Sequence, residues 1–142
     1  MYSVEKIEVT LTVPSVEETA AWYERVLGWV GHYDTFDAEG RCVFGSVSRE
    51  STPASDMGEF KGFNLSRASA GGARADMTSC ESISAWIFVD DVDGVYAKVI
   101  RSGVTPDLPP QDQPWGGKMF SMRDVNGLRL AFIEMAKGVT EP

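Results

Sequence analysis

The sequence predicts an α+β fold built from two β-α-β-β-β modules that follow one another along the chain. Two strand-helix units carry this prediction, one near the N-terminus and one in the second half. Ser84 follows Glu8, and Asp91 follows Ser15, by the same 76 residues. A constant offset between two similar units is the sign of an internal repeat.

The first strand is expected in the stretch EKIEVTLTV, where apolar and polar residues alternate strictly. This is the period of a strand with one buried face. The apolar face is expected to lie under a helix, and the polar face to meet solvent or a cavity. The apolar residues are Ile7, Val9, Leu11 and Val13, and the polar residues are Glu8, Thr10 and Thr12.

A helix is expected directly after this strand. Ser15 and Glu18 have the spacing of a capping box, apolar residues follow at helical spacing from Val16 onward, and Gly28 supplies a stop. The second unit repeats these signals, with an alternating strand from residue 84, Asp91 as the helix cap and Gly103 as the stop.

Further strands follow each helix. Turns are expected at Glu39-Gly40 and at Asn126-Gly127, the second of which is a strong hairpin signal. The modules are expected at about 4–68 and 81–136 of a single domain over 1–142, with a Gly/Ala/Ser linker at about 69–80. The stretches SRESTPASDMGE and TPDLPPQDQP are expected to be loops.

Composition and charge limit the classes of partner and the cellular location that are expected. The 142 residues contain no apolar run long enough to span a membrane, and the N-terminus lacks the layout of a signal peptide, so a cytoplasmic protein is expected. A net charge of -8 disfavours nucleic acid and favours cationic ligands, although it can also serve solubility alone. Cys42 and Cys80 are expected to be free thiols.

The chain resembles the vicinal oxygen chelate superfamily, which contains glyoxalase I, the bleomycin-resistance proteins and the extradiol dioxygenases. The stretches that carry the resemblance are VTLTVPSVEETAAWYERVLGW, WIFVDDVDGVYAKVIRSGV and PWGGKMFSMRDVNGLRLAF. The resemblance implies a cup-shaped mixed sheet with the helices outside and the active cavity inside. It also implies a homodimer, with cups formed within one chain or shared between two.

Metalloenzymes of this superfamily hold a divalent cation with four inward His, Glu or Gln side chains. The resemblance places those positions at Glu8, Asn64, Ser84 and Ala131. One carboxylate, one amide, one hydroxyl and one methyl do not make a tight site, so neither a metal nor another cofactor is expected. The sole histidine, His32, lies off these positions and is expected to be a surface or structural residue.

The alternation of each strand predicts which side chains line the cup. Aromatic side chains with a few polar anchors are the usual composition of a small-molecule pocket. Glu8 is the only candidate general base, if an apolar cup beside Trp86 raises its pKa; the alternative is a carboxylate that is paired or hydrated. The predicted ligand-binding residues are Glu8, Thr10, Asn64, Ser84, Trp86, Phe88, Trp115, Arg129 and Ala131.

Three functions remain open from the sequence. The first is a metal-free protein that binds a small cationic or aromatic molecule in the cup. The second is a glyoxalase-like lyase or isomerase with an altered metal site that includes Glu8. The third is an interaction or regulatory module whose cup is empty.

Overall fold

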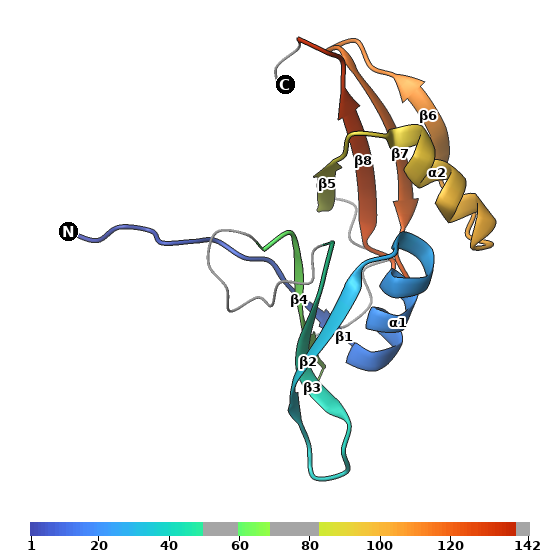
Figure 1. Ribbon diagram of the computed structural model, residues 1–142. Helices are drawn as coiled ribbons and strands as arrows, with labels where there is room; N and C mark the ends of the chain where they lie inside the picture. The colour runs from blue at the N-terminus through green and yellow to red at the C-terminus, as the bar shows by residue number, and fades with distance from the viewer. Residues whose placement is uncertain (50–59, 69–82, 139–142) are drawn as a thin grey trace. The chain divides into compact units, whose positions relative to one another are not determined.

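The computed structural model describes residues 1–49, 60–68 and 83–138 (Figure 1). The chain divides into two compact units, Met1–Asp76 and Met77–Pro142. Each unit contains one helix and one four-stranded mixed sheet, in the order β-α-β-β-β. The predicted α+β fold with two such modules is therefore confirmed.

Unit 1 has the strand order β1-β4-β3-β2, in which β1 is parallel to β4 and the other neighbours are antiparallel. Helix α1 packs against β2, β3 and β4. The elements are β1 (Thr10–Val13), α1 (Val16–Leu27), β2 (Val30–Phe36), β3 (Cys42–Ser48) and β4 (Gly62–Arg67).

Helix α1 begins and ends at the residues predicted to cap it. The Ser15 hydroxyl accepts a hydrogen bond from the Glu18 backbone N–H at 3.1 Å, which satisfies one of the free donors at the helix start. At the other end Gly28 adopts φ 72°, a left-handed conformation that ends the helix at little steric cost. The chain can therefore turn directly into β2.

An aromatic cluster joins α1 to its sheet. Tyr23 is fully buried, and its ring centroid lies 5.1 Å from that of Trp22, 5.4 Å from Trp29 and 6.2 Å from Phe63 on β4. A Cβ added to Gly45 on β3 would lie 3.2 Å from Val16 of the helix. Phe63 and Gly45 therefore face α1, and the residues next to them on each strand face away.

The first strand is shorter than its alternation suggests. Strand β1 begins at Thr10, and Ile7 is 87% exposed while Val9 is also exposed. The expectation that Ile7 and Val9 lie under a helix is therefore wrong. The ladder runs from Thr10 onward and reaches back only to Val9, whose carbonyl accepts from the Asn64 N–H at 2.9 Å, so Ile7 precedes the paired segment.

Unit 2 repeats this layout with the strand order β5-β8-β7-β6, and α2 packs against β6, β7 and β8 (Figure 1). The Asp91 carboxylate accepts from the Gly94 N–H at 3.0 Å and caps α2, as predicted, and Gly103 follows the helix with φ 92°. The elements are β5 (Ser84–Phe88), α2 (Val92–Arg101), β6 (Leu108–Asp112), β7 (Gly117–Arg123) and β8 (Arg129–Met135).

Aromatic contacts also identify the two faces of the second sheet. Phe120 of β7 stacks on Phe132 of β8 with centroids 5.2 Å apart, and Tyr96 of α2 meets Phe120 edge-on at 5.3 Å. Phe120 and Phe132 therefore face the helix. Ala131 and Ile133, their neighbours on β8, face away from it.

The proline-rich stretch TPDLPPQDQP is not only a loop, because it contains β6. Pro109 and Pro110 are tolerated because β6 is the edge strand, and its register with β7 is irregular between Leu108 and Gln111. The expected loop SRESTPASDMGE begins at Ser48, the last residue of β3. Residues 50–59 of that loop, and all of the linker at 69–80 with Cys80, lie outside the described residues.

The hairpin between β7 and β8 has the predicted turn. Asp124 is buried and its carboxylate accepts from the N–H groups of Asn126 and Leu128, at 2.8 and 2.9 Å. Gly127 adopts φ 91°. Helices in the described part of the chain are too short or too polar to cross a membrane.

Candidate functional site

Each sheet has one face turned away from its helix, which we call the helix-free face of that unit. In unit 1 this face carries a row of polar side chains that runs across all four strands. Directly paired residues of adjacent strands point to the same side of a sheet. Thr10 pairs with Asn64, Asn64 with Ser46, and Ser46 with His32. The four side chains form what we call the polar row.

Glu8 joins this row at its β1 end. The Asn64 side-chain amide donates to one Glu8 carboxylate oxygen at 2.9 Å, and the Lys6 ammonium donates to the other at 3.1 Å. These bonds stabilise the ionised form, so Asn64 first and Lys6 second hold the pKa of Glu8 below its ordinary value. The raised pKa that a general base would need is absent, and Glu8 is a paired carboxylate.

The middle of the polar row is buried and not fully hydrogen-bonded. Ser46 is 1% exposed and Asn64 is 5% exposed. Within residues 1–49, 60–68 and 83–138, no hydrogen-bond partner contacts Ser46 Oγ, Asn64 Oδ1 or His32 Nε2, and all three atoms are buried. His32, which is expected from the sequence to be a surface or structural residue, lies on the same row as Asn64.

Unit 2 presents aromatic side chains on its helix-free face. Trp86 stacks with Trp115 at a centroid distance of 6.1 Å and an interplanar angle of 20°, and its centroid lies 6.4 Å from that of Phe88. Trp86 and Phe88 are 49% and 41% exposed. We call these three residues the aromatic platform.

A glycine makes room for the platform. A Cβ added to Gly117, the first residue of β7, would collide with the Trp115 ring, so this ring lies directly over the β7 backbone. Trp86 pairs with Ala131, which is buried beneath this face. Gly117 thus has a steric role in this face.

A basic row borders the platform. Arg129 pairs with Ser84 on one side and with Arg123 on the other. Arg123 donates to the Gly127 carbonyl at 3.0 Å. Arg123 Nε also lies 4.0 Å from the Asp107 carboxylate, so this guanidinium group is already paired within unit 2.

Residues 7–132 match the family described as the Glyoxalase/Bleomycin resistance protein/Dioxygenase superfamily. The chain belongs to this superfamily. No curated protein matches the chain.

Solved structures of superfamily members share the fold at low identity. A glyoxalase-related enzyme from Clostridium phytofermentans has a TM-score of 0.73 and 22% identity, over 94% of this chain and 97% of that chain. A bleomycin-binding protein complexed with bleomycin has a TM-score of 0.65 and 20% identity, over 92% of this chain and 98% of that chain. A member from Sphaerobacter thermophilus has a TM-score of 0.67 and 21% identity, over 92% and 98%.

The residues at the four positions where the resemblance places metal ligands do not fit a divalent cation. In unit 1 both oxygens of Glu8 accept hydrogen bonds, and the Asn64 group that faces Glu8 is an N–H donor. In unit 2 the corresponding residues are Ser84 and Ala131, a hydroxyl and a methyl. Among the residues that the structure describes, no three His, Cys, Asp or Glu side chains are grouped as metal ligands.

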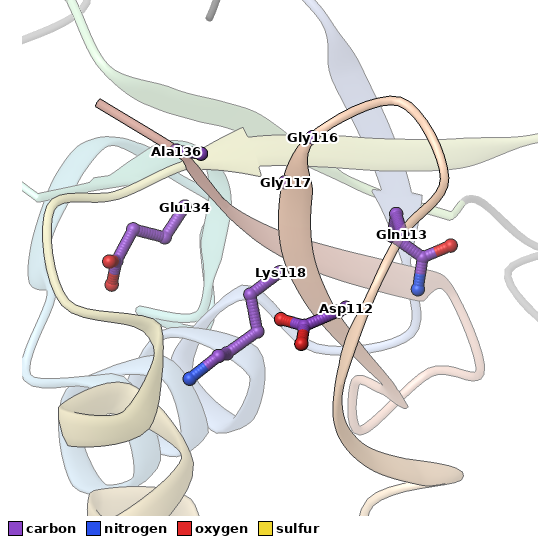
Figure 2. Close-up of a pocket in the computed structure, with 7 residues that line it drawn as sticks. All are labelled: Asp112, Gln113, Gly116, Gly117, Lys118, Glu134 and Ala136. Atoms are coloured by element: carbon purple, nitrogen blue, oxygen red, sulfur yellow. The ribbon is translucent and has the colours of Figure 1, made fainter. Parts of the chain in front are cut away.

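A cavity of about 340 Å³ lies elsewhere in unit 2 (Figure 2). Lys118 of its lining donates to Asp93 of α2 at 3.1 Å, and Glu134 accepts from the Val92 N–H at 2.9 Å. These contacts place both side chains on the helix side of the sheet, away from the aromatic platform. The lining residues are Asp112, Gln113, Gly116, Gly117, Lys118, Glu134 and Ala136.

Proposed function

We propose that this protein binds a small aromatic molecule, preferably a cationic one, without the help of a metal ion. The observation that carries the proposal is the stacked pair of Trp86, which is 49% exposed, and Trp115, which is partly buried. Exposed indole faces attract flat rings and cations. The net charge of -8 adds a field that favours cations.

Several further features support binding rather than metal-centred catalysis. The resemblance places Ala131 where a metalloenzyme of the superfamily has a carboxylate, and a methyl group cannot bind a metal ion. A relative of the same fold has been solved in complex with bleomycin, a small molecule. Phe88 extends the apolar surface of the platform, and the row of Ser84 and Arg129 supplies polar contacts along its border.

Calorimetric titration with bleomycin and with proflavine, a planar aromatic cation, tests this function. We expect saturable binding of at least one probe, weakened about tenfold by Trp86→Ala or Trp115→Ala because each removes a stacking face. Phe36→Ala is the matched control, since Phe36 is an exposed aromatic residue of unit 1. Unchanged affinity in both tryptophan variants would reject the proposal.

The variant Gly117→Ala tests whether binding depends on the position of the Trp115 ring and not only on its presence. The added methyl would displace the Trp115 ring from its stacked position while leaving both indoles in the protein. We expect weaker probe binding with little change in thermal stability, because Trp115 lies in a turn and not in the core. Wild-type affinity in this variant would show that the stacked geometry is irrelevant to binding.

The rival function, a lyase or isomerase with a metal held partly by Glu8, makes a different prediction. It requires stoichiometric metal in the purified protein that is lost on Glu8→Ala. We expect substoichiometric metal and no such dependence, because both Glu8 oxygens already accept hydrogen bonds from Asn64 and Lys6.

We also propose that the protein is a homodimer. Tyr2, Val4, Ile7 and Val9 are exposed apolar residues of one short segment, and such surfaces are often covered by a partner. Light scattering during size exclusion tests this, and a monomeric mass at micromolar concentration would contradict it.

A further inference from the structure

The polar row of unit 1 contains three buried polar atoms that suggest a ligand of their own. Ser46 Oγ, Asn64 Oδ1 and His32 Nε2 come from three adjacent strands, and none has a hydrogen-bond partner in the described part of unit 1. A buried polar atom without a partner loses free energy comparable to a whole hydrogen bond, so folded proteins keep few of them. Three in one row are a concentration that packing alone does not require.

The contact with Glu8 defines what Asn64 can still bind. Because the Glu8 carboxylate only accepts hydrogen bonds, the Asn64 group that faces it is the NH₂, and the amide orientation is thereby assigned. Asn64 Oδ1 remains as an acceptor and needs a donor from a ligand. On the next strand, the Ser46 hydroxyl can donate or accept, and His32 Nε2 does one or the other according to its tautomer.

We propose that Asn64, Ser46 and His32 form a subsite that binds successive carboxamide groups of a neutral, peptide-like ligand. A carboxamide offers an N–H to Asn64 Oδ1 and a carbonyl to the Ser46 hydroxyl. A carboxylate only accepts, so it would face the Asn64 and Glu8 oxygens without a proton to share. An ammonium only donates and leaves the Ser46 proton without an acceptor.

The span of the row sets the length of the ligand. Neighbouring strands lie about 4.8 Å apart, so the three side chains extend across roughly 10 Å. Consecutive peptide groups in an extended chain repeat at about 3.5 Å. Two carboxamides separated by one carbon atom therefore reach two or more of the three atoms at once.

Access to the Asn64 end of the row involves Glu8. The three atoms are covered in this conformation, and Glu8 is bonded directly to Asn64. Glu8 precedes β1, and its neighbours Ile7 and Val9 are exposed. Segments with little buried apolar surface open at low free energy, so a ligand can displace the Glu8 side chain without unfolding the sheet.

Titration with N-acetylglycinamide, followed by NMR of the backbone amides, tests the proposal on the full chain. N-acetylglycine is the matched probe, because it differs only by a carboxylate in place of the terminal carboxamide. We expect millimolar binding of the diamide, with shifts centred on Ser46, Asn64 and His32, and roughly tenfold weaker binding of the acid. Equal binding of both probes, or shifts elsewhere, would overturn it.

Ser46→Ala gives a second readout that a purely structural role would not produce. Removing a buried hydroxyl without a partner is expected to leave thermal stability unchanged or higher, while diamide affinity falls several-fold. Ser66→Ala is the control, since Ser66 lies on the same face of β4 but pairs with Phe44 in the next row. Equal affinity in the two variants would contradict the proposal. The subsite lies in unit 1 alone, so its failure leaves the aromatic platform of unit 2 unaffected.

Discussion

The side chain of Asn64 holds the Glu8 carboxylate through a 2.9 Å hydrogen bond between β4 and the segment before β1. The Lys6 ammonium completes this contact from the other side. The resemblance to the superfamily places metal ligands at the positions of Glu8 and Asn64. In this protein the two side chains form a hydrogen bond with each other instead.

Replacement of Asn64 is expected to raise the pKa of Glu8. Asn64 is the largest cause of the lowered pKa, so Asn64→Leu should move it up toward the ordinary value of 4.5, and Lys6→Ala should move it up by less. Titration of the Glu8 side chain by carbon-detected NMR measures both shifts. A pKa that is unchanged in Asn64→Leu would mean that the hydrogen bond does not form in solution.

The same contact predicts a direction for acid stability. A carboxylate whose folded-state pKa is depressed contributes stability above its unfolded pKa, and this contribution is lost as the pH falls through the folded value. The Glu8 contribution should thus be complete above about pH 4.5 and decline in more acidic solution. Urea melts of wild type and Asn64→Leu should differ most near neutral pH and converge in acid.

Glu134 is expected to stabilise the start of α2. Its carboxylate accepts from the Val92 N–H, one of the free donors of the first turn. Glu134→Ala should reduce the free energy of unfolding by about 1 kcal/mol, and Glu134→Gln should retain most of it, because the amide oxygen can still accept. Urea denaturation measures the loss.

Asp93→Asn is the control for this effect. Asp93 lies in the same turn, but its ion pair with Lys118 is exposed, and such pairs contribute at most a fraction of a kcal/mol in most proteins. If Asp93→Asn were as destabilising as Glu134→Ala, general loss of negative charge at the helix start would explain the result better than the specific hydrogen bond.

Cys42 is expected to resist thiol reagents in the folded protein. Its side chain is fully buried, and burial together with the nearby Glu17 carboxylate raises its pKa, so little thiolate forms at neutral pH. In a Cys80→Ser background, maleimide labelling of native Cys42 should be on the order of a hundredfold slower than in urea. Comparable rates in both conditions would show that the core around Cys42 opens freely.

Much of the fold followed from local sequence signals. Ser15, Asp91 and the glycines that follow each helix act within one or two turns of chain, so their roles were visible without a partner strand. The alternation around Trp86 likewise predicted an aromatic face. The start of β1 was misjudged because alternation alone does not reveal whether a partner strand continues opposite Ile7.

The composition of the polar row could not be predicted in the same way. Ser46 and His32 join Asn64 only through the register between β2, β3 and β4, which depends on how the hairpins pair. The available signal was the alternation within the stretch from Cys42 to Ser48, which places Ser46 and Gly45 on opposite faces of the strand. Which strand would lie beside it, and so which side chains would meet, is decided by packing against α1.

The two consecutive prolines of β6 have a consequence for self-association. Pro109 and Pro110 lack backbone N–H groups, and they occupy an edge of the sheet where a strand from another molecule could otherwise attach. Edges without a continuous row of donors are poor templates for intermolecular strand pairing and fibril growth. Among the described strands of unit 2, the other edge is β5, a strand of five residues, so another chain would pair more readily beside β5 than beside β6.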